Sequence, residues 1–189
     1  MLIAFDQALN TTGYAVFNRK DGSLVAYDKF TTESADEEYK LREIRDKVLE
    51  LIDKYKPTKI AIEEIQLQQI PGTTAHGNVE TFKKLAHVQG VLYEVMAEKE
   101  IPFEVVPSVT WKSHCGVKGR ARAEQKRNAQ AFVLEYYGVK AIQDICDAIC
   151  IGKYSLTDNK PVAIYYQNTS DCLYVLKPVI LPYLLSTSR

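Results

Sequence analysis

The stretch Leu2–Phe17, LIAFDQALNTTGYAVF, decides the expected fold. Its apolar run Leu2–Phe5 is long enough for a short buried strand, and Asp6 follows that strand directly. Turn-forming residues come next and a second apolar run ends at Phe17, so the stretch predicts a β-hairpin with Asp6 near its mouth. The alternative is a hairpin that turns this acid toward water, without function.

Apolar periodicity predicts the elements that surround this hairpin. Ser23–Phe30 is expected to form a third strand, and Lys59–Glu64 and Ile101–Val106 a fourth and a fifth. The apolar residues of Glu37–Tyr55 recur at three- and four-residue steps, which is typical of an amphipathic helix that packs one face on a sheet. Ala121–Tyr137 is also expected to be helical. The pattern indicates an α/β domain.

Composition sets the class of protein. The 189 residues are 46% hydrophobic and 25% charged, which fits one globular domain with a substantial core. Lysine plus arginine equals aspartate plus glutamate, at 24 each, so any polyanionic partner must meet a local basic patch. No stretch reaches the roughly 18 apolar residues of a membrane span, so we expect a soluble, cytosolic protein with no membrane partner.

The cysteines do not indicate a metal or disulfide framework. Cys115, Cys146, Cys150 and Cys172 form no CxxC pair and have no regular spacing. Cys146 and Cys150 could share a metal with His114, but two buried thiols on an apolar helix face are the interpretation we favour.

A long helix, Val79–Lys99, is expected after a flexible loop at Pro71–Asn78 that could lie over a substrate. The helix carries two apolar stripes, one with Phe82, Leu85, Leu92 and Met96, the other with Val88, Val91 and Val95. One stripe would pack on the sheet and leave the other for a second subunit, which predicts a homodimer. The alternative is a helix sandwiched within the monomer.

A basic segment follows the fifth expected strand. Between Lys112 and Arg127 the only acid is Glu124, so the net charge of the segment is about +5. Its six basic residues are Lys112, Lys118, Arg120, Arg122, Lys126 and Arg127. Arg120 and Arg122 crowd the expected start of a helix, where cations oppose the macrodipole unless the site holds a phosphate. We therefore expect this segment to bind a nucleic-acid backbone, rather than to be only a solvated run of charge.

Two further acids, Asp144 and Asp147, lie three residues apart and thus on one face of a helix. They could be simple capping residues, but with Asp6 and Glu63 the chain has four acids at the ends of elements. Clustered carboxylates repel one another, and hard divalent cations resolve that repulsion. This constellation predicts two-metal phosphodiester hydrolysis, with ions about 3.5–4 Å apart.

At this point the chain resembles the RuvC-type Holliday junction resolvases, a branch of the RNase H-like nucleases. The resemblance spans Leu2–Tyr154 and rests on the Asp6 hairpin, on Ala61-Ile62-Glu63, and on Asp144-Ile-Cys-Asp147-Ala-Ile. It implies an RNase H-like fold, with a five-stranded mixed sheet flanked by helices. It also implies a structure-selective, homodimeric endonuclease that nicks four-way and related branched DNA junctions. The small bacteriophage members are the nearest likeness, in which case the protein would work in the bacterial host cytosol.

The resemblance also implies roles for particular residues. Asp6, Glu63, Asp144 and Asp147 would be catalytic acids that bind two Mg²⁺ or Mn²⁺ ions in each active site. Lys112 and Lys126 resemble basic residues that contact the scissile region, which makes Lys126 a catalytic candidate.

Some features depart from the family pattern. Ala8 stands where many relatives have glycine, and Gln66 stands where cellular resolvases often place an aromatic residue that helps to open the junction centre. The mode of strand separation and the cut-site preference are therefore not implied. We divide the chain into a nuclease domain at 1–154 and an extension at 155–189, which is either an added hairpin or a poorly ordered tail.

Two other functions remain open from the sequence. The first is a junction-binding protein of the same fold that has lost catalysis. The second is a phosphate-binding domain of the sugar-kinase or actin-like type, because Asp6 with Thr11–Gly13 resembles their phosphate hairpin. That activity needs two such domains, and 189 residues hold only one. A nuclease assay with added Mg²⁺ discriminates the three.

Overall fold

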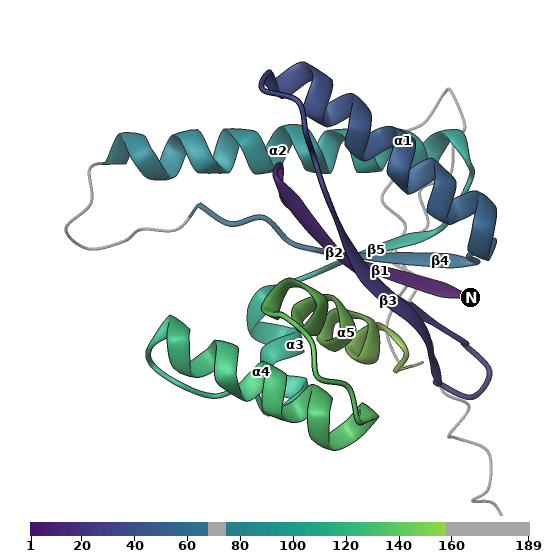
Figure 1. The fold of residues 1–189 in the computed structure, drawn as a ribbon, viewed down its shortest axis with the longest axis vertical. Helices are drawn as coiled ribbons and strands as arrows, with labels where there is room; N and C mark the ends of the chain where they lie inside the picture. Colours follow the sequence, from purple (N-terminus) through teal and green to yellow (C-terminus); the bar gives the residue numbers. More distant parts are fainter. Residues whose placement is uncertain (68–74, 158–189) are drawn as a thin grey trace, which may run out of the picture.

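A five-stranded mixed sheet forms the centre of the protein, as the sequence predicts (Figure 1). The structure is a computed structural model that describes residues 1–67 and 75–157. The strand order is β3-β2-β1-β4-β5, with β1 antiparallel to β2 and parallel to β4. The strands are β1 (Leu2–Asp6), β2 (Thr11–Phe17), β3 (Leu24–Thr31), β4 (Lys59–Glu63) and β5 (Phe103–Val106).

Helices cover both faces of the sheet (Figure 1). On one face lie α1 (Glu37–Tyr55) and α2 (Ala75–Glu98). On the other face lie α3 (Ser108–His114), α4 (Arg122–Tyr137) and α5 (Gln143–Ser155). In the part of the chain that the structure describes, no helix is long and apolar enough to cross a membrane.

The strand β1 contributes to two hydrophobic cores because its side chains alternate between the faces of the sheet. Ile3 and Phe5 belong to the core under α1 and α2. Leu2 and Ala4 belong to the core under α5. All four side chains are fully buried, so β1 is fixed from both sides and Asp6 is delivered to a defined place at its end.

Glycines let α5 approach β1 and β2 closely. A Cβ atom on Gly13 of β2 would lie 2.1 Å from the carbonyl oxygen of Asp144, at the start of α5. A Cβ atom on Gly152, further along α5, would lie 2.2 Å from a ring carbon of Phe17. Neither position has room for a side chain, and these two contacts set the distance between α5 and the strands.

A buried ion pair fixes the far end of α5. Lys59 of β4 donates hydrogen bonds to Glu104 Oε2 of β5 at 2.7 Å and to the carbonyl oxygen of Ser155 at 3.1 Å. The hydroxyl of Ser155 donates to the same Glu104 oxygen at 2.7 Å. The last turn of α5 is thereby tied to the two parallel strands.

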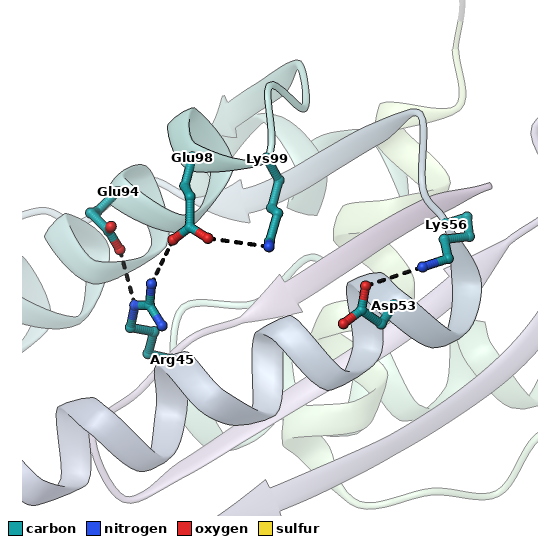
Figure 2. Close-up of polar contacts among 6 residues, drawn as sticks. All are labelled: Arg45, Asp53, Lys56, Glu94, Glu98 and Lys99. Atoms are coloured by element: carbon teal, nitrogen blue, oxygen red, sulfur yellow. Dashed lines mark hydrogen bonds and ion pairs between the residues drawn. The ribbon is translucent and has the colours of Figure 1, made fainter.

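Ion pairs join α1 to α2 across their exposed edges. Figure 2 shows Arg45 of α1 between two acids of α2, with Nε 3.2 Å from Glu94 and a terminal nitrogen 2.5 Å from Glu98. At the start of α1, Glu37 accepts a hydrogen bond from His87 Nδ1 of α2 at 2.6 Å. Exposed pairs stabilise weakly, by about 0–1 kcal/mol each, but they fix how the two helices lie against each other.

The division of the long helix into two stripes is wrong. Val88, Leu92, Val95 and Met96 are all at most 1% exposed and belong to one core with the sheet. Their spacing of four, three and one residues describes a single helical face. Val91, which the sequence grouped with Val88, is instead half-buried beside that face.

Two boundaries also differ from expectation. The helix α2 begins at Ala75, so the end of the expected loop Pro71–Asn78 is helical, while 68–74 lies outside the described residues. The short helix α3 is an element that the sequence did not predict. Cys146 and Cys150 are buried free thiols as expected, and Cys115 is a third. Cys172 and, beyond residue 157, the expected extension 155–189 lie outside the described residues.

Candidate functional site

Two acids meet where β1 and β4 end. The strands are parallel neighbours, with Phe5 paired to Ile62, so Asp6 and Glu63 follow at adjacent positions on one edge of the sheet. The start of α5 brings Asp144 and Asp147 to the same edge. All four predicted acids line one cavity of about 490 Å³.

Gln7 holds the backbone of Glu63 in place. Its side-chain Nε2 donates to the carbonyl oxygen of Glu63 at 2.5 Å, and its Oε1 accepts from the Glu63 N–H at 3.0 Å. A primary amide that both donates to and accepts from one residue copies a rung of a β-ladder. The side chain of Gln7, which is 6% exposed, thus extends the pairing of β1 with β4 by one residue.

The helix α3 supplies the neighbours of the Glu63 side chain. The buried indole of Trp111 donates a hydrogen bond from Nε1 to Glu63 Oε1 at 2.9 Å. The ammonium of Lys112 lies 5.2 Å from the centre of the Trp111 ring, a cation–π contact. One carboxylate oxygen of Glu63 is therefore fixed by a donor, and a cation is held beside the acids.

The two acids of α5 are positioned differently. Gln143 Nε2 donates to Asp147 Oδ2 at 3.1 Å, one turn along the same helix. Asp144 has its backbone carbonyl pressed against Gly13, so strand β2 sets its position. No side chain caps the start of α5, because Ile142 occupies the N-cap. A capping role for Asp144 and Asp147, the alternative left open by the sequence, is therefore not what their contacts show.

Burial and crowding raise the pKa values of these acids. Burial raises the pKa of Asp6 well above its usual range, and the carboxylates of Glu63, Asp147 and Asp144 raise it further. Burial is also the main cause of the raised pKa of Glu63 and of Asp147. Lys112 acts in the opposite direction on all three groups. Arg122 also lowers the pKa of Glu63, and Lys126 that of Asp147, so basic side chains offset the effect of burial and crowding only in part.

The donor set fits a hard divalent cation in its chemistry. Carboxylate oxygens are the ligands that Mg²⁺ and Mn²⁺ prefer, and a cation between these acids would relieve their repulsion. Among the residues that the structure describes, however, no three acidic, histidine or cysteine side chains converge closely enough in this conformation to hold one ion. The acids line one cavity, but their carboxylate oxygens do not converge on a common metal position.

The structure divides the predicted basic residues into two groups. Lys112, Arg120, Arg122 and Lys126 line the same cavity as the acids. Lys118 and Arg127 are exposed and do not line the cavity.

Polar side chains of α4 hold the backbone of the loop between α3 and α4, which carries Lys118 and Arg120. Gln125 donates to the carbonyl oxygen of Gly119 at 2.9 Å, and Asn128 donates to that of Lys118 at 2.6 Å. Glu124 Oε2 accepts from the backbone N–H of Arg120 at 3.1 Å. These contacts order the loop through its backbone. Glu124, the only acid of the basic segment, is thereby engaged by the backbone of the loop.

Sequence reasoning missed the residues that support the acids. Gln7 and Gln143 each lie next to a predicted acid in the sequence, and that adjacency was the only available signal. Trp111 stood out as the single tryptophan, at the edge of the basic segment. Its contact with Glu63 spans 48 positions of the chain, which no local pattern encodes.

Comparison with known proteins identifies relatives over most of this domain. A family model described as crossover junction endodeoxyribonuclease RuvC matches residues 2–153. The RuvC of Legionella pneumophila (strain Corby) is 31% identical over 94 residues, which are 48% of this chain and 49% of that protein. The chain thus spans about half the length of this relative. The RuvC of Dictyoglomus thermophilum is 23% identical over 154 residues, which are 80% of this chain and 92% of that protein.

Solved structures share the fold. Thermus thermophilus RuvC in complex with a Holliday junction substrate superposes with a TM-score of 0.60 at 16% identity, covering 81% of this chain and 90% of the other. The yeast mitochondrial Holliday junction resolvase Ydc2 superposes with a TM-score of 0.51 at 16% identity, covering 82% of this chain and 77% of the other. At such identities the likeness establishes the fold, which is the RNase H-like fold.

Proposed function

Because the chain belongs to the RuvC family of crossover junction endodeoxyribonucleases, we propose that it is a metal-dependent endonuclease that nicks four-way and related branched DNA junctions. The observation that carries this proposal is the shared cavity. The four predicted acids reach it from β1, β4 and α5. The same space is lined by four basic residues: Lys112, Arg120, Arg122 and Lys126.

The acids are the proposed metal ligands. When bound, divalent cations held by Asp6, Glu63, Asp144 and Asp147 would polarise the scissile phosphate and activate the attacking water. Gln7 and Trp111 act on Glu63, one through its backbone and the other through its carboxylate. The role that we assign to these two residues is to position Glu63, because the hydrogen bonds of both side chains go to that residue.

The basic residues are the proposed DNA contacts. Lys112 and Lys126 lie in the cavity with the acids and would offset the charge of the scissile phosphate. Arg120 and Arg122 flank the start of α4, a helix of 16 residues whose N-cap makes no side-chain hydrogen bond. Free backbone N–H groups and positive side chains at a helix start favour a phosphate group. Lys118 and Arg127, which are exposed outside the cavity, would contact DNA farther from the cut.

A homodimer remains part of the proposal. Val88 and Val95 pack within the monomer, so the surface available for a second subunit is the half-buried side of α2 beside the core face. Val91 lies on that side, whereas Phe82 lies on the opposite flank of the core face and Leu85 lines the cavity that holds the acids. Two-fold symmetry would place two cavities on opposed strands of a four-way junction, whose phosphates have the same symmetry.

The alternatives are less well supported. Four acids crowded in one cavity destabilise the fold, as their raised pKa values indicate. A protein that only binds junctions has no need of such a cluster. A sugar-kinase or actin-like ATPase needs a second domain of this fold around the nucleotide, and the described residues form one sheet. Incubation of a labelled four-way junction with the protein and Mg²⁺ tests the proposal. Paired nicks support it, and an intact junction with a folded, DNA-bound protein favours the binding module.

A further inference from the structure

A second groove opens beside the catalytic cavity, between the tip of the β1–β2 hairpin and the helices α1 and α2. Its volume is about 450 Å³. Ala8 of the hairpin and Leu85 of α2 line both the groove and the catalytic cavity, so the two spaces share a wall and adjoin each other. Figure 1 shows α2 and α3–α4 on opposite sides of the strand ends that carry the acids, so this groove lies across the cavity from the basic segment.

Two lysines give this groove its charge. Lys40 comes from the first turn of α1 and Lys84 from α2. The Lys40 ammonium donates to Asn10 Oδ1 at 2.7 Å, a neutral partner that orients the lysine without cancelling its charge. For Lys84, no hydrogen bond or ion pair is found with the part of the chain whose side chains the structure describes, 1–67 and 79–157.

The one acid that lines the groove, Glu37, is paired with a histidine. Glu37 accepts the hydrogen bond from His87 of α2 at 2.6 Å, so its carboxylate is used in joining α1 to α2. The other lining residues are neutral, and the stems of the lysines add to an apolar wall that includes Leu9 and Ala35. Apolar walls with cationic ends suit a polymer that alternates sugars with phosphates.

We propose that this groove is a second DNA-backbone site, which receives phosphates of the cleaved strand on the side of the scissile phosphate opposite to α3 and α4. The inference rests on the proposed nuclease function and adds to it the direction of the strand across the site. The strand passes from the basic segment over the four acids and then between Lys40 and Lys84. Contacts on both sides hold the scissile phosphate over the acids, whereas the basic segment alone holds it from one side.

The salt dependence of DNA binding tests this site. The assay measures the affinity of the full-length protein for a four-way junction at several salt concentrations in EDTA, so that no strand is cut. Lys84→Gln should lower the slope of log affinity against log salt by about 0.7 to 0.9, the value for one lost phosphate contact. The matched control is Lys83→Gln, which removes the same charge from the adjacent, exposed position of α2 that lines neither space.

The two variants separate a specific site from a general loss of charge. A lower slope for Lys84→Gln with an unchanged slope for Lys83→Gln supports the groove. Equal slopes for the two variants overturn it. Thermal melting and molar mass of both variants establish that fold and oligomeric state are those of the parent.

A second measurement locates the contact on the DNA. Single neutral methylphosphonates are placed at successive positions of the cleaved strand. At one position beyond the scissile phosphate, the substitution should weaken binding by the parent but not by Lys84→Gln, because the contact is already lost in the variant. If the losses add at every position, Lys84 contacts none of these phosphates and the proposal fails.

Failure of the groove differs from failure of the nuclease function. If the parent cuts the junction and only the Lys84→Gln result is negative, the groove is overturned and the proposed function stands. If the parent binds with a slope that depends on Lys84 but never cuts with Mg²⁺, the groove stands and the nuclease function is overturned. A parent that binds no DNA overturns both.

Discussion

Asp6 is the residue at which the proposed catalytic role and stability oppose each other. Because burial and neighbouring carboxylates raise its pKa, the folded state holds a proton on Asp6 more tightly than the unfolded chain does. Its contribution to stability is therefore full below the unfolded pKa of about 4. That contribution is lost as pH rises through the higher folded pKa, and at neutral pH the ionised group destabilises the fold.

Asp6→Asn should abolish junction cleavage while junction binding survives, since one of the four proposed metal ligands loses its charge. In EDTA the variant should also melt at a higher temperature than the parent at pH 8, with a smaller difference near pH 4.5. Melting curves at the two pH values check the sign. A variant that is less stable than the parent at pH 8 contradicts the repulsion among the acids.

Gln7 should act only through Glu63. Gln7→Leu removes both hydrogen bonds to the Glu63 backbone, so we expect cleavage about tenfold slower and a higher Mg²⁺ concentration for half-maximal rate. Junction affinity in EDTA should stay within twofold, because Gln7 is buried. Gln130→Leu, at an exposed position of α4 that lines neither space, is the matched control, because it also removes a hydrogen bond from a glutamine to a backbone carbonyl. Equal Mg²⁺ requirements in the parent and Gln7→Leu would remove Gln7 from this role.

Gly13→Ala tests how strand β2 sets the position of α5. The added Cβ would lie 2.1 Å from the Asp144 carbonyl, and because the obstacle is backbone, the start of α5 must move. We expect slower cleavage together with a loss of stability on the order of 1–3 kcal/mol. Gly90→Ala, where a Cβ meets nothing within 4 Å, is the control and should leave both unchanged. Parent-like cleavage by Gly13→Ala would mean that the position of Asp144 does not depend on this contact.

The sequence predicted the acids of the site but not the side chains that hold them in place. Asp6 and Glu63 were predictable because each ends an apolar run, and parallel pairing of those runs brings them together. Trp111 and Gln7 were not, because a hydrogen bond across the sheet depends on register and rotamer, which hydrophobic periodicity does not carry. The basic segment was predictable as a charge run, but its division into residues inside and outside the cavity required the loop geometry set by α4.

Among the elements, α2 was predicted least well. Its length was expected within a few residues, but Val88 and Val95 were grouped in a different stripe from Leu92 and Met96, although the four residues complete one buried face. An apolar pattern cannot distinguish a stripe that faces the sheet from one that faces a partner. The helix α3 was missed because, at seven residues, it is too short for a periodic pattern.

Charge substitutions on α2 therefore separate core from interface. Val88→Glu buries an unpaired charge at a position with 0% exposure and should destabilise the fold by about 4 kcal/mol or more. Val91→Glu, at a half-buried position, should leave a folded protein whose mass falls from dimer to monomer. Melting curves and light scattering at micromolar concentration distinguish the two effects. A parent that is already monomeric under these conditions would remove the interface.

For the whole molecule, zero net charge makes DNA binding a matter of local surfaces. One basic segment per subunit neutralises only a few phosphates, so binding to plain duplex should be modest and fall steeply with salt. A symmetric dimer engages a four-way junction with both segments and gains from effective concentration. Replacing Lys118, Arg120 and Arg122 by alanine should weaken binding to junction and duplex alike and lower each salt slope. An unchanged slope would mean that the segment is only solvated charge.

Cleavage of a four-way junction, with each of its four strands labelled in turn, tests the proposed function most directly. With Mg²⁺ the protein should nick two opposed strands near the branch point and leave a linear duplex of the same sequence largely uncut. Omission of the metal, or the Asp6→Asn substitution, should remove the nicks. Cleavage of junction and duplex at equal rates, or cleavage by Asp6→Asn at the parent rate, would contradict a junction-selective nuclease that uses these four acids.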